Sequence, residues 1–362
     1  MGQSGTEMFK PLEGDDPRHV AGYRLRAKLG VGGMGRVYLS YTPGGRPVAI
    51  KLIRSEFGTD PEFRRRFQQE VVSAQRVQGL YTAPVIDADT EGERPWLATA
   101  YVPGPSLAAA VNAYGKLPVN TVLLLVAGIA EALQVILRAG IVHRDLKPSN
   151  VLLASDGPRV IDFGIARAAD ATSLTASGIT VGTPSFMAPE QAAGTEITHA
   201  TDVFALGQVA AFAARGVPAF GEGTAHGVLY RIVHEQPQLD GLPEELDELV
   251  TRCLVKEPAE RPSLDEIIRL CQQGDETELR RPEDWVPAAV ASDITGRVAA
   301  AAPPAPAAPP PPSAAPAPPP PVTAPTPPPP AASPQALTHP ATENRYAPPP
   351  RRPGSARRRP HP

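Results

Sequence analysis

The chain has 362 residues, enough for one large domain or two ordinary domains with a sizeable buried core. Its 35 Lys and Arg against 38 Asp and Glu give a formal net charge of −3, which argues against a protein built mainly to coat nucleic acid. The two cysteines, Cys253 and Cys271, form no C-x-x-C motif, so a disulfide framework or a structural zinc site is not indicated. A reducing, cytoplasmic setting fits this cysteine usage best.

Composition divides the chain into four parts. Residues 1–22 are polar and are predicted to be a flexible leader, whereas residues 23–273 have the apolar periodicity of a globular domain. This pattern decays over residues 274–302, which we interpret as a linker. Residues 303–362 hold more than half of the 46 prolines and are predicted to be a disordered, polyproline-II-like tail. A spacer is the simpler interpretation of the tail, and a ligand for SH3-like or WW-like domains is the alternative.

The tail also differs in charge from the rest of the chain. Residues 303–362 contain six Arg, no Lys and one acid, a charge of +5 that leaves −8 for residues 1–302. Any peripheral attraction to anionic lipid therefore belongs to the tail. No signal peptide is recognisable, and the most apolar run, Val122–Ala130, is shorter than the roughly 20 residues that a membrane span needs. We expect a cytoplasmic protein with no membrane span, in which this run belongs to a buried core helix.

The body of the chain begins with predicted strands and continues with predicted helices. Short β-rich segments between turn residues indicate an antiparallel meander at Tyr23–Leu29, Arg36–Tyr41 and Pro47–Leu52. A helix is predicted at Pro61–Arg76, and two further strands at Pro84–Ala88 and Trp96–Val102. Later helices are expected at Val119–Ala139, Thr201–Arg215, Thr224–Glu235, Glu244–Leu254 and Ser263–Gln273. Strands followed by helices predict a two-lobed α+β molecule and not an alternating βαβ fold.

A glycine-rich segment, Gly30-Val31-Gly32-Gly33-Met34-Gly35, joins the first two strands of the meander. Because a predicted strand follows it, the glycines are placed at a hairpin tip and not at the start of a dinucleotide-binding helix. Backbone N–H groups at such a tip can approach phosphates without interference from Cβ atoms. The motif alone is a weak signal, and a plain glycine-rich turn is the alternative.

Lys51 lies at the end of the predicted third strand. Alternation along the strand puts Lys51 on the same face as Ala49 and on the opposite face to Val48. A lysine on a strand is most often a solvated edge residue, but a lysine facing a cleft needs an acidic partner. Glu70 on the following helix is the best candidate, because Glu62 lies in the first turn, where the helix dipole accounts for it.

Two polar loops follow the long apolar helix. The first is His143-Arg144-Asp145-Leu146-Lys147-Pro148-Ser149-Asn150, where Pro148 prevents the helix from continuing. The second, Asp162-Phe163-Gly164, comes directly after an apolar strand. Two carboxylates and an amide on adjacent loops suit a divalent cation and a hydroxyl nucleophile. Each residue alone could be a cap or a turn residue, so the combination and its order carry the functional interpretation.

With these motifs in this order, the sequence resembles the eukaryotic-type protein serine/threonine kinases, especially those of actinobacteria. Two further motifs complete the series, the segment GTPSFMAPE at residues 182–190 and Glu260-Arg261-Pro262. The resemblance covers about residues 23–273. It implies the two-lobed protein kinase fold, with a small β-rich N-lobe and a larger helical C-lobe. It also implies ATP- and magnesium-dependent transfer of the γ-phosphoryl group to Ser and Thr hydroxyls of protein substrates, with no nucleic-acid partner.

The resemblance implies catalytic roles for individual residues. Lys51 would hold the α- and β-phosphates and pair with Glu70. Asp145 would accept or orient the proton of the acceptor hydroxyl, and Lys147 would steady the γ-phosphoryl group. Asn150 and Asp162 would bind magnesium, with manganese as the alternative metal. The ATP site would comprise Leu29, Gly30, Gly32, Gly35, Val37, Ala49, Lys51, Tyr101 and Val102.

The resemblance also implies supporting roles around the catalytic loop. Asp202 would anchor the backbone of that loop, Glu190 would pair with Arg261, and His143 would be structural. The hinge between the lobes would be Leu97–Val102. It departs from many relatives at Ala100, where they carry Glu. Adenine is read there by backbone groups, so binding should survive, and Thr99 would be a small gatekeeper.

The segment Ile165–Phe186 resembles an activation loop. We expect autophosphorylation there, first at Thr175 and Thr180 and then at Thr172, with self-association allowing it in trans. Such a phosphate could order the loop against Arg144.

Two other functions stay open at this point. A pseudokinase scaffold is disfavoured because Lys51, Asp145, Asn150 and Asp162 are all present. A small-molecule kinase of the antibiotic-phosphotransferase type shares the fold, but the GTPSFMAPE segment favours a protein substrate.

Overall fold

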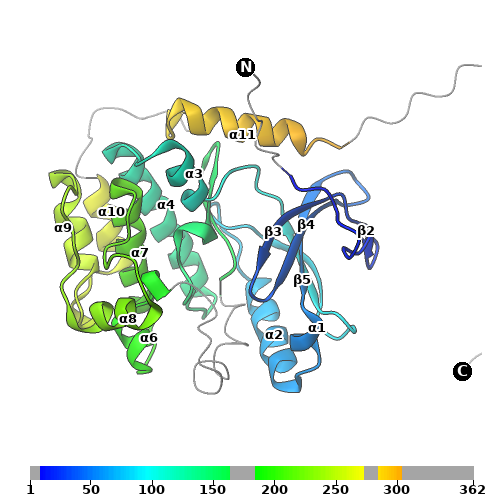
Figure 1. Cartoon of the computed structure of the whole chain (residues 1–362), viewed down its shortest axis with the longest axis horizontal. Coiled ribbons are helices and arrows are strands. Elements are labelled where there is room, and N and C mark those ends of the chain that lie inside the picture. The colour runs from blue at the N-terminus through cyan, green and yellow to red at the C-terminus, as the bar shows by residue number, and fades with distance from the viewer. Residues whose placement is uncertain (1–8, 164–183, 273–283, 304–362) are drawn as a thin grey trace, which may run out of the picture. The chain divides into compact units, whose positions relative to one another are not determined.

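Two lobes follow one another along the chain in the computed structural model, which describes residues 9–163, 184–272 and 284–303 (Figure 1). The N-lobe is a five-stranded sheet with one long helix against it, and the C-lobe is mainly helical. The prediction of a two-lobed α+β fold with strands first is confirmed. The predicted phosphorylation sites and nearly all of the proline-rich tail lie outside the described residues.

The N-lobe sheet has the order β3-β4-β5-β7-β6, and neighbouring strands run antiparallel. Its strands are β3 (Ala27–Gly32), β4 (Gly35–Tyr41), β5 (Pro47–Ile53), β6 (Val85–Asp89) and β7 (Trp96–Ala100), preceded by the short pair β1 (His19–Val20) and β2 (Tyr23–Arg24). Along β5, Val48 and Ile50 are fully buried beside Trp96, while Lys51 belongs to the opposite face. The predicted alternation of this strand is therefore confirmed.

Helix α2 (Pro61–Ala74) covers one face of the sheet and follows the short α1 (Ser55–Gly58). The Asp60 carboxylate caps α2 by accepting a hydrogen bond of 2.9 Å from the backbone N–H of Glu62. The buried Phe63 and Phe67 pack against Leu97 of the sheet. This packing fixes the helix beside β5, which carries Lys51.

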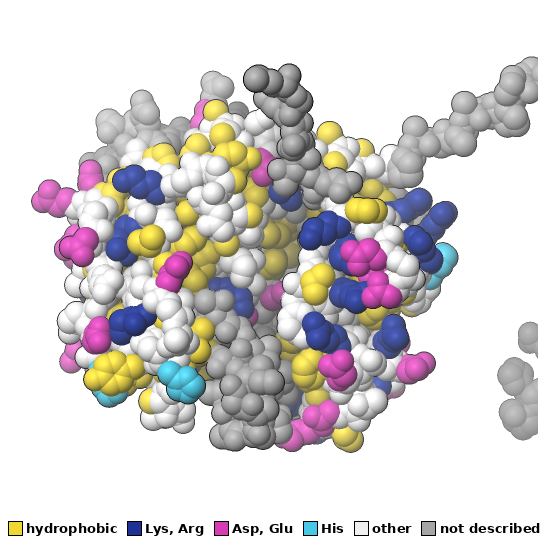
Figure 2. Space-filling view, in the orientation of Figure 1, with side chains coloured by type: hydrophobic (Ala, Val, Ile, Leu, Met, Phe, Trp, Pro, Cys, Tyr) yellow, Lys and Arg dark blue, Asp and Glu magenta, His cyan; other side chains and the backbone are white. Residues whose placement is uncertain are grey.

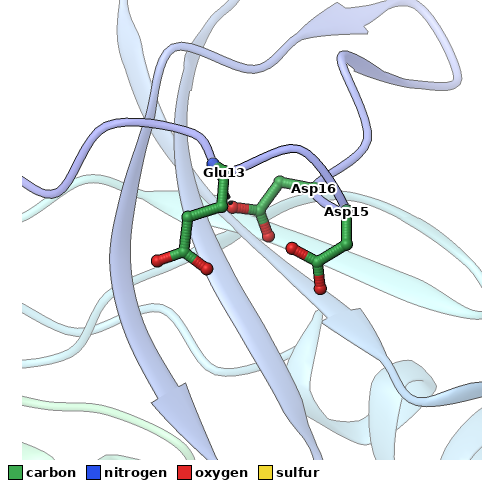
Figure 3. A group of neighbouring side chains, drawn as sticks. All are labelled: Glu13, Asp15 and Asp16. Carbon is green, nitrogen blue, oxygen red and sulfur yellow. Dashed lines mark hydrogen bonds between the residues drawn. The ribbon is translucent and has the colours of Figure 1, made fainter.

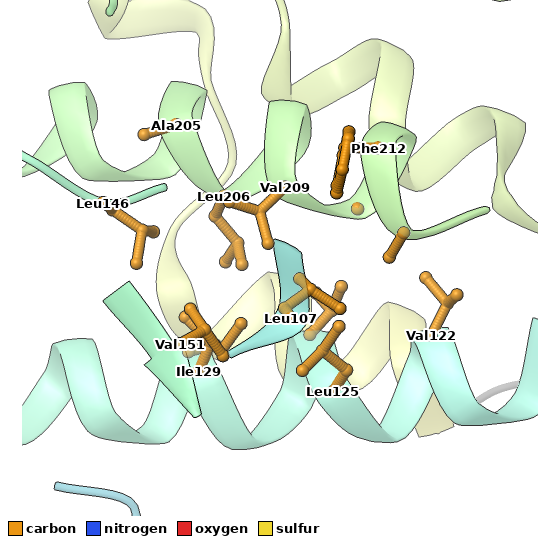
Figure 4. Packing of buried hydrophobic residues seen from close by; sticks show 14 of the residues in the cluster. Leu107, Val122, Leu125, Ile129, Leu146, Val151, Ala205, Leu206, Val209 and Phe212 are labelled. Atoms are coloured by element: carbon orange, nitrogen blue, oxygen red, sulfur yellow. The ribbon is translucent and has the colours of Figure 1, made fainter. Parts of the chain in front are cut away.

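The core of the C-lobe lies between two long helices, α4 (Val119–Arg138) and α7 (His199–Arg215) (Figure 4). Leu125 and Ile129 of α4 face Leu206 and Val209 of α7. Around them lie α3 (Leu107–Tyr114), α6 (Pro189–Ala193), α8 (Ala225–His234), α9 (Glu244–Cys253), α10 (Leu264–Gln272) and the hairpin of β8 (Val151–Ala154) and β9 (Gly157–Val160). Among the described residues, α4 alone is long and apolar enough to cross a membrane, and 56% of its most apolar window is buried in this core.

The predicted flexible leader is wrong for residues 9–22. Strand β1 pairs with β2, and the buried Asp16 accepts a hydrogen bond of 2.7 Å from the hydroxyl of Tyr38. Asp16 also forms ion pairs with Lys28 at 3.0 Å and with Arg36 at 2.8 Å. These contacts hold the leader on the N-lobe, and polar composition alone does not reveal them because the partners lie on β3 and β4.

Glu13, Asp15 and Asp16 bring their carboxylates within 4.8 Å of one another (Figure 3). Lys28 pairs with Glu13 at 3.0 Å, and Arg36 pairs with Asp15 at 2.7 Å. The cluster is thus matched by cations of the sheet. It fastens the leader to the N-lobe.

The predicted linker over residues 274–302 is wrong for its second half. Residues Ala288–Ala300 form helix α11, whose Val290 and Ile294 are buried in the C-lobe core. The indole N–H of Trp285 donates a hydrogen bond of 2.8 Å to the backbone oxygen of Ala154. Many alanines and one Asp–Arg pair hide the apolar stripe of this helix in a composition that reads as a linker.

Candidate active site

A cavity of about 690 Å³ opens between the two lobes. In Figure 2 the surface is hollowed between the lobes, and hydrophobic side chains line the upper part of the hollow. Of the predicted site residues, Glu70 is outside the lining. The others all line this one cavity: Leu29, Gly30, Gly32, Gly35, Val37, Ala49, Lys51, Tyr101, Val102, Asp145, Lys147, Asn150 and Asp162.

The glycine segment forms the tip of the β3–β4 hairpin, as predicted. A Cβ atom on Gly35 would overlap the backbone oxygen of Leu52 on β5, so this glycine is required by the close approach of two strands. Gly30 and Gly32 differ, since nothing lies within 4 Å of a Cβ built on either of them. The open space at these two positions leaves their backbone accessible from the cavity.

Lys51 and Asp162 meet across the cavity. The Lys51 ammonium lies 3.0 Å from an Asp162 carboxylate oxygen. The ion pair that the structure describes for Lys51 is therefore with Asp162, and the pairing of Lys51 with Glu70 that the resemblance implied stays a prediction. Glu70 lies on α2, the helix that was expected to supply it, and its role stays a prediction.

The first polar loop brings Asp145, Lys147 and Asn150 together. The Lys147 ammonium lies 2.8 Å from both carboxylate oxygens of Asp145. The Asn150 amide donates to the backbone oxygen of Asp145 at 2.8 Å and to its carboxylate at 3.0 Å. These bonds use the amide N–H groups of Asn150 and leave its carbonyl oxygen as an acceptor. Together with the Asp162 carboxylate it offers the oxygen ligands that magnesium prefers.

With this geometry in place, comparison with known proteins decides the family. The model of the protein kinase domain matches residues 23–270. The chain belongs to the protein kinase family. The kinase domain of PknI from Mycobacterium tuberculosis, a solved structure, superposes with a TM-score of 0.58 at 30% identity, covering 70% of this chain and 96% of that one.

The chain is also similar to curated proteins that are named as serine/threonine-protein kinases. The chain is 46% identical over 289 residues to the probable serine/threonine-protein kinase PkwA of Thermomonospora curvata, covering 80% of this chain and 38% of that protein. It is 49% identical over 257 residues to the serine/threonine-protein kinase AfsK of Streptomyces coelicolor, covering 71% of this chain and 32% of that one. The chain therefore spans about a third of the length of these relatives.

Asp202 of α7 supports the backbone of the first polar loop, residues 143–150, which is the catalytic loop of this kinase domain. Its carboxylate accepts hydrogen bonds from the backbone N–H groups of His143 at 2.7 Å and Arg144 at 2.8 Å, as the resemblance implied. Arg144 has a φ of 66°, a conformation that costs a non-glycine residue energy and needs such support. Burial raises the pKa of Asp202, and the two N–H donors oppose this by favouring its charged form.

His143 is structural in this kinase domain, as expected. Its ring is fully buried and its Nε2 lies 3.2 Å from the backbone oxygen of Ile161. Its Nδ1 accepts from the backbone N–H of Asp145 at 3.3 Å, so Nε2 carries the proton. The ring thus joins the two polar loops that hold Asp145 and Asp162.

Glu190 and Arg261 form the second ion pair that the resemblance implied. The guanidinium reaches both carboxylate oxygens, at 2.7 and 2.8 Å, and both side chains are buried. Burial raises the pKa of Glu190, but the hydrogen bonds from Arg261 and Thr201 outweigh it and hold this pKa below its usual range. The pair ties the segment after the activation loop to the segment before α10.

Sequence reasoning missed several residues that line the cavity, of which three stand out. Gln191 lines the cavity and donates a hydrogen bond of 2.7 Å to the backbone oxygen of Arg144. Phe9 and Arg297 line it from outside the range of the family model. Gln191 directly follows a recognised motif and could have been considered, whereas nothing in the sequence marks Phe9 or Arg297.

Proposed function

We propose that this chain is an active, ATP- and magnesium-dependent protein serine/threonine kinase. The observation that carries the proposal is the convergence of Lys51, Asp145, Asn150 and Asp162 on one cavity beneath a glycine hairpin. Phosphoryl transfer needs mainly in-line positioning and neutralisation of charge on the phosphoryl oxygens. Lys51, the oxygens of Asn150 and Asp162 and the Asp145 carboxylate are the groups that supply this.

Each group has a part in the proposed reaction. The acceptor hydroxyl oxygen forms a bond to the γ-phosphorus while the bond from that phosphorus to the β,γ-bridging oxygen breaks, and ADP leaves. Asp145 receives the proton of the acceptor hydroxyl, and Lys147 stabilises the transferring group. Lys51 binds the α- and β-phosphates, with Glu70 as its partner in the active state. Asn150 and Asp162 would hold magnesium, for which manganese is the alternative.

The adenine end of the site is assigned to the hinge, which comprises the end of β7 and the residues that follow it. Thr99, Ala100, Tyr101 and Val102 line the cavity there. Backbone groups of this segment would read the base, so the absence of Glu at Ala100 does not remove a binding group. The small Thr99 would leave room behind the base for inhibitors.

Transfer of radiolabelled γ-phosphate from ATP to a generic basic protein tests the proposal. The purified full chain should label the substrate, and an Asp145→Asn variant should not. Asp156→Asn is the matched control, because Asp156 is exposed in the β8–β9 turn and should leave labelling unchanged. Nucleotide binding without transfer would favour the pseudokinase, and transfer only to small hydroxylated molecules would favour the antibiotic-phosphotransferase type.

Autophosphorylation in the activation loop is the second part of the proposal. Incubation with magnesium and ATP should place phosphate at Thr175, Thr180 or Thr172, mapped by mass spectrometry. Self-association would let one copy modify another, so an active chain should phosphorylate the Asp145→Asn variant in a mixture. We further propose cytoplasmic protein substrates and a tail whose arginines make peripheral contacts with anionic membranes.

A further inference from the structure

Helix α11 lies beyond the range of the family model but is part of the folded molecule. The model ends at residue 270, and α11 runs from Ala288 to Ala300. Figure 1 shows it along the upper side of the molecule, passing from above α3 toward the N-lobe sheet. Its first anchor is in the C-lobe, where Trp285 bonds to Ala154 and Val290 is fully buried.

The far end of α11 is anchored to the N-lobe. The hydroxyl of Tyr41 on β4 donates a hydrogen bond of 3.2 Å to the backbone oxygen of Ala301. The helix and its flanking residues therefore contact both lobes.

Arg297 lies on the inward stripe of this helix. Val290, Ile294, Arg297 and Ala301 recur at spacings of four, three and four residues, which is one face of a helix. The Arg297 side chain is 24% exposed, whereas its neighbour Val298 points outward and is 52% exposed. Asp293 holds the guanidinium with a hydrogen bond of 2.8 Å one turn earlier.

The surroundings of Arg297 place it at the hinge end of the cavity. The charge of Arg297 acts on Tyr101 of the hinge. Burial is the main cause that raises the pKa of Tyr101 to about 12, Arg297 lowers this pKa, and Tyr41 and Asp293 raise it further. The ring of Phe9 packs edge-on against Tyr101 with the ring centres 6.2 Å apart. Phe9 and Arg297 both line the cavity, so segments from before and after the family's range close its hinge end.

We propose that α11 is the outer wall of the nucleotide site at its hinge end and that Arg297 contacts the nucleoside part of the bound nucleotide. A guanidinium can donate to ribose hydroxyls and to base acceptors, and its plane can stack on a base. Asp293 fixes the guanidinium, which lowers the entropy lost when a ligand binds. This inference rests on the proposed nucleotide site and adds a nucleotide-binding residue outside the kinase motifs.

Calorimetric titration of the full chain with Mg-ADP tests the inference. Because Arg297→Ala removes a charged hydrogen-bond donor, its Kd should rise about three- to tenfold, with Arg297→Lys in between. Val298→Ala is the matched control, since this side chain is the next one along and points to solvent. Thermal unfolding of each variant shows that the fold is retained. A Kd for Arg297→Ala within twofold of the wild type would overturn the inference.

A second measurement tests whether α11 as a whole forms a wall of the nucleotide site. Hydrogen exchange of the full chain should slow at the backbone amides of residues 288–300 when Mg-ADP is added. Protection confined to the glycine hairpin and the hinge would overturn the proposed wall. Failure of the wild type to bind Mg-ADP at all would overturn the proposed function as well, so the two failures are distinguishable.

Discussion

Lys51 and Asp162 pair at 3.0 Å although they come from different lobes, one from β5 and the other from the loop after β9. The Lys51 side chain is 15% exposed, so the pair is partly shielded from water and closes the inner end of the cavity. In the proposed reaction Lys51 binds the phosphates, and Asp162 would hold the magnesium ion. The pair thus joins the two lobes at the point where the phosphates are expected to bind.

Replacement of Lys51 tests this arrangement. Lys51→Met keeps the unbranched side chain except for its terminal ammonium and so removes the charge, and we expect kcat/KM for ATP to fall about 100-fold or more. Lys116→Met, at an exposed position, is the matched control and should retain activity. A Lys51→Met protein with near wild-type kcat/KM would contradict the role of Lys51.

Local pattern sufficed for the elements that alternate or repeat within a few residues. The alternation of β5 put Lys51 on the same face as Ala49, which the structure shows to line the cavity, and the apolar run of α4 marked a core helix. Pairings between distant segments were reached only through family resemblance, as with Asp202 beneath His143. The ion pair between Lys51 and Asp162 depends on how the two lobes are placed, which no local pattern encodes.

The ends of the body were mispredicted for a related reason. The leader is polar because its Asp16 forms ion pairs with cationic side chains of the sheet. Helix α11 is alanine-rich, and only a narrow apolar stripe of it is buried against the C-lobe. Such segments are stabilised by docking and not by their own composition. Composition therefore placed both outside the fold.

The glycines of the hairpin should separate into two kinds. Gly35→Ala should destabilise the protein by about 1–3 kcal/mol, because the added Cβ overlaps the Leu52 oxygen and the strands must shift. Gly32→Ala fits in open space and should leave stability unchanged while raising the KM for ATP. Thermal unfolding and KM measurements distinguish the two, with Gly44→Ala in the β4–β5 turn as the control. Equal losses of stability at Gly32 and Gly35 would refute this division.

The Glu190–Arg261 pair predicts a pH-dependent contribution to stability. The folded-state pKa of Glu190 lies below its unfolded value, so its contribution is present above an unfolded pKa of about 4.3 and is lost as the pH falls through the folded value. At pH 7, Glu190→Gln leaves the buried Arg261 without its partner charge and should cost about 3 kcal/mol. The difference from wild type should shrink below the unfolded pKa.

Urea unfolding of both proteins at neutral and acidic pH measures this difference. Glu260→Gln is the matched control, because Glu260 is exposed next to Arg261 and should change stability little at either pH. A loss for Glu190→Gln that stays constant with pH would mean that the charge of Glu190 is not what stabilises the pair.

Asp202→Asn should lower kcat, although Asp202 does not contact the substrate. An amide offers one oxygen where the carboxylate offers two, so the N–H of either His143 or Arg144 would lose its acceptor. The strained Arg144 backbone would relax and displace Asp145, and a displacement of about 1 Å can cost roughly 100-fold in rate. We expect kcat to fall by about that factor while the KM for ATP changes little, since the glycine hairpin and Lys51 remain in place. Asp247→Asn on the exposed side of α9 is the control, and an Asp202→Asn enzyme with normal kcat would show that the catalytic loop keeps its shape without this carboxylate.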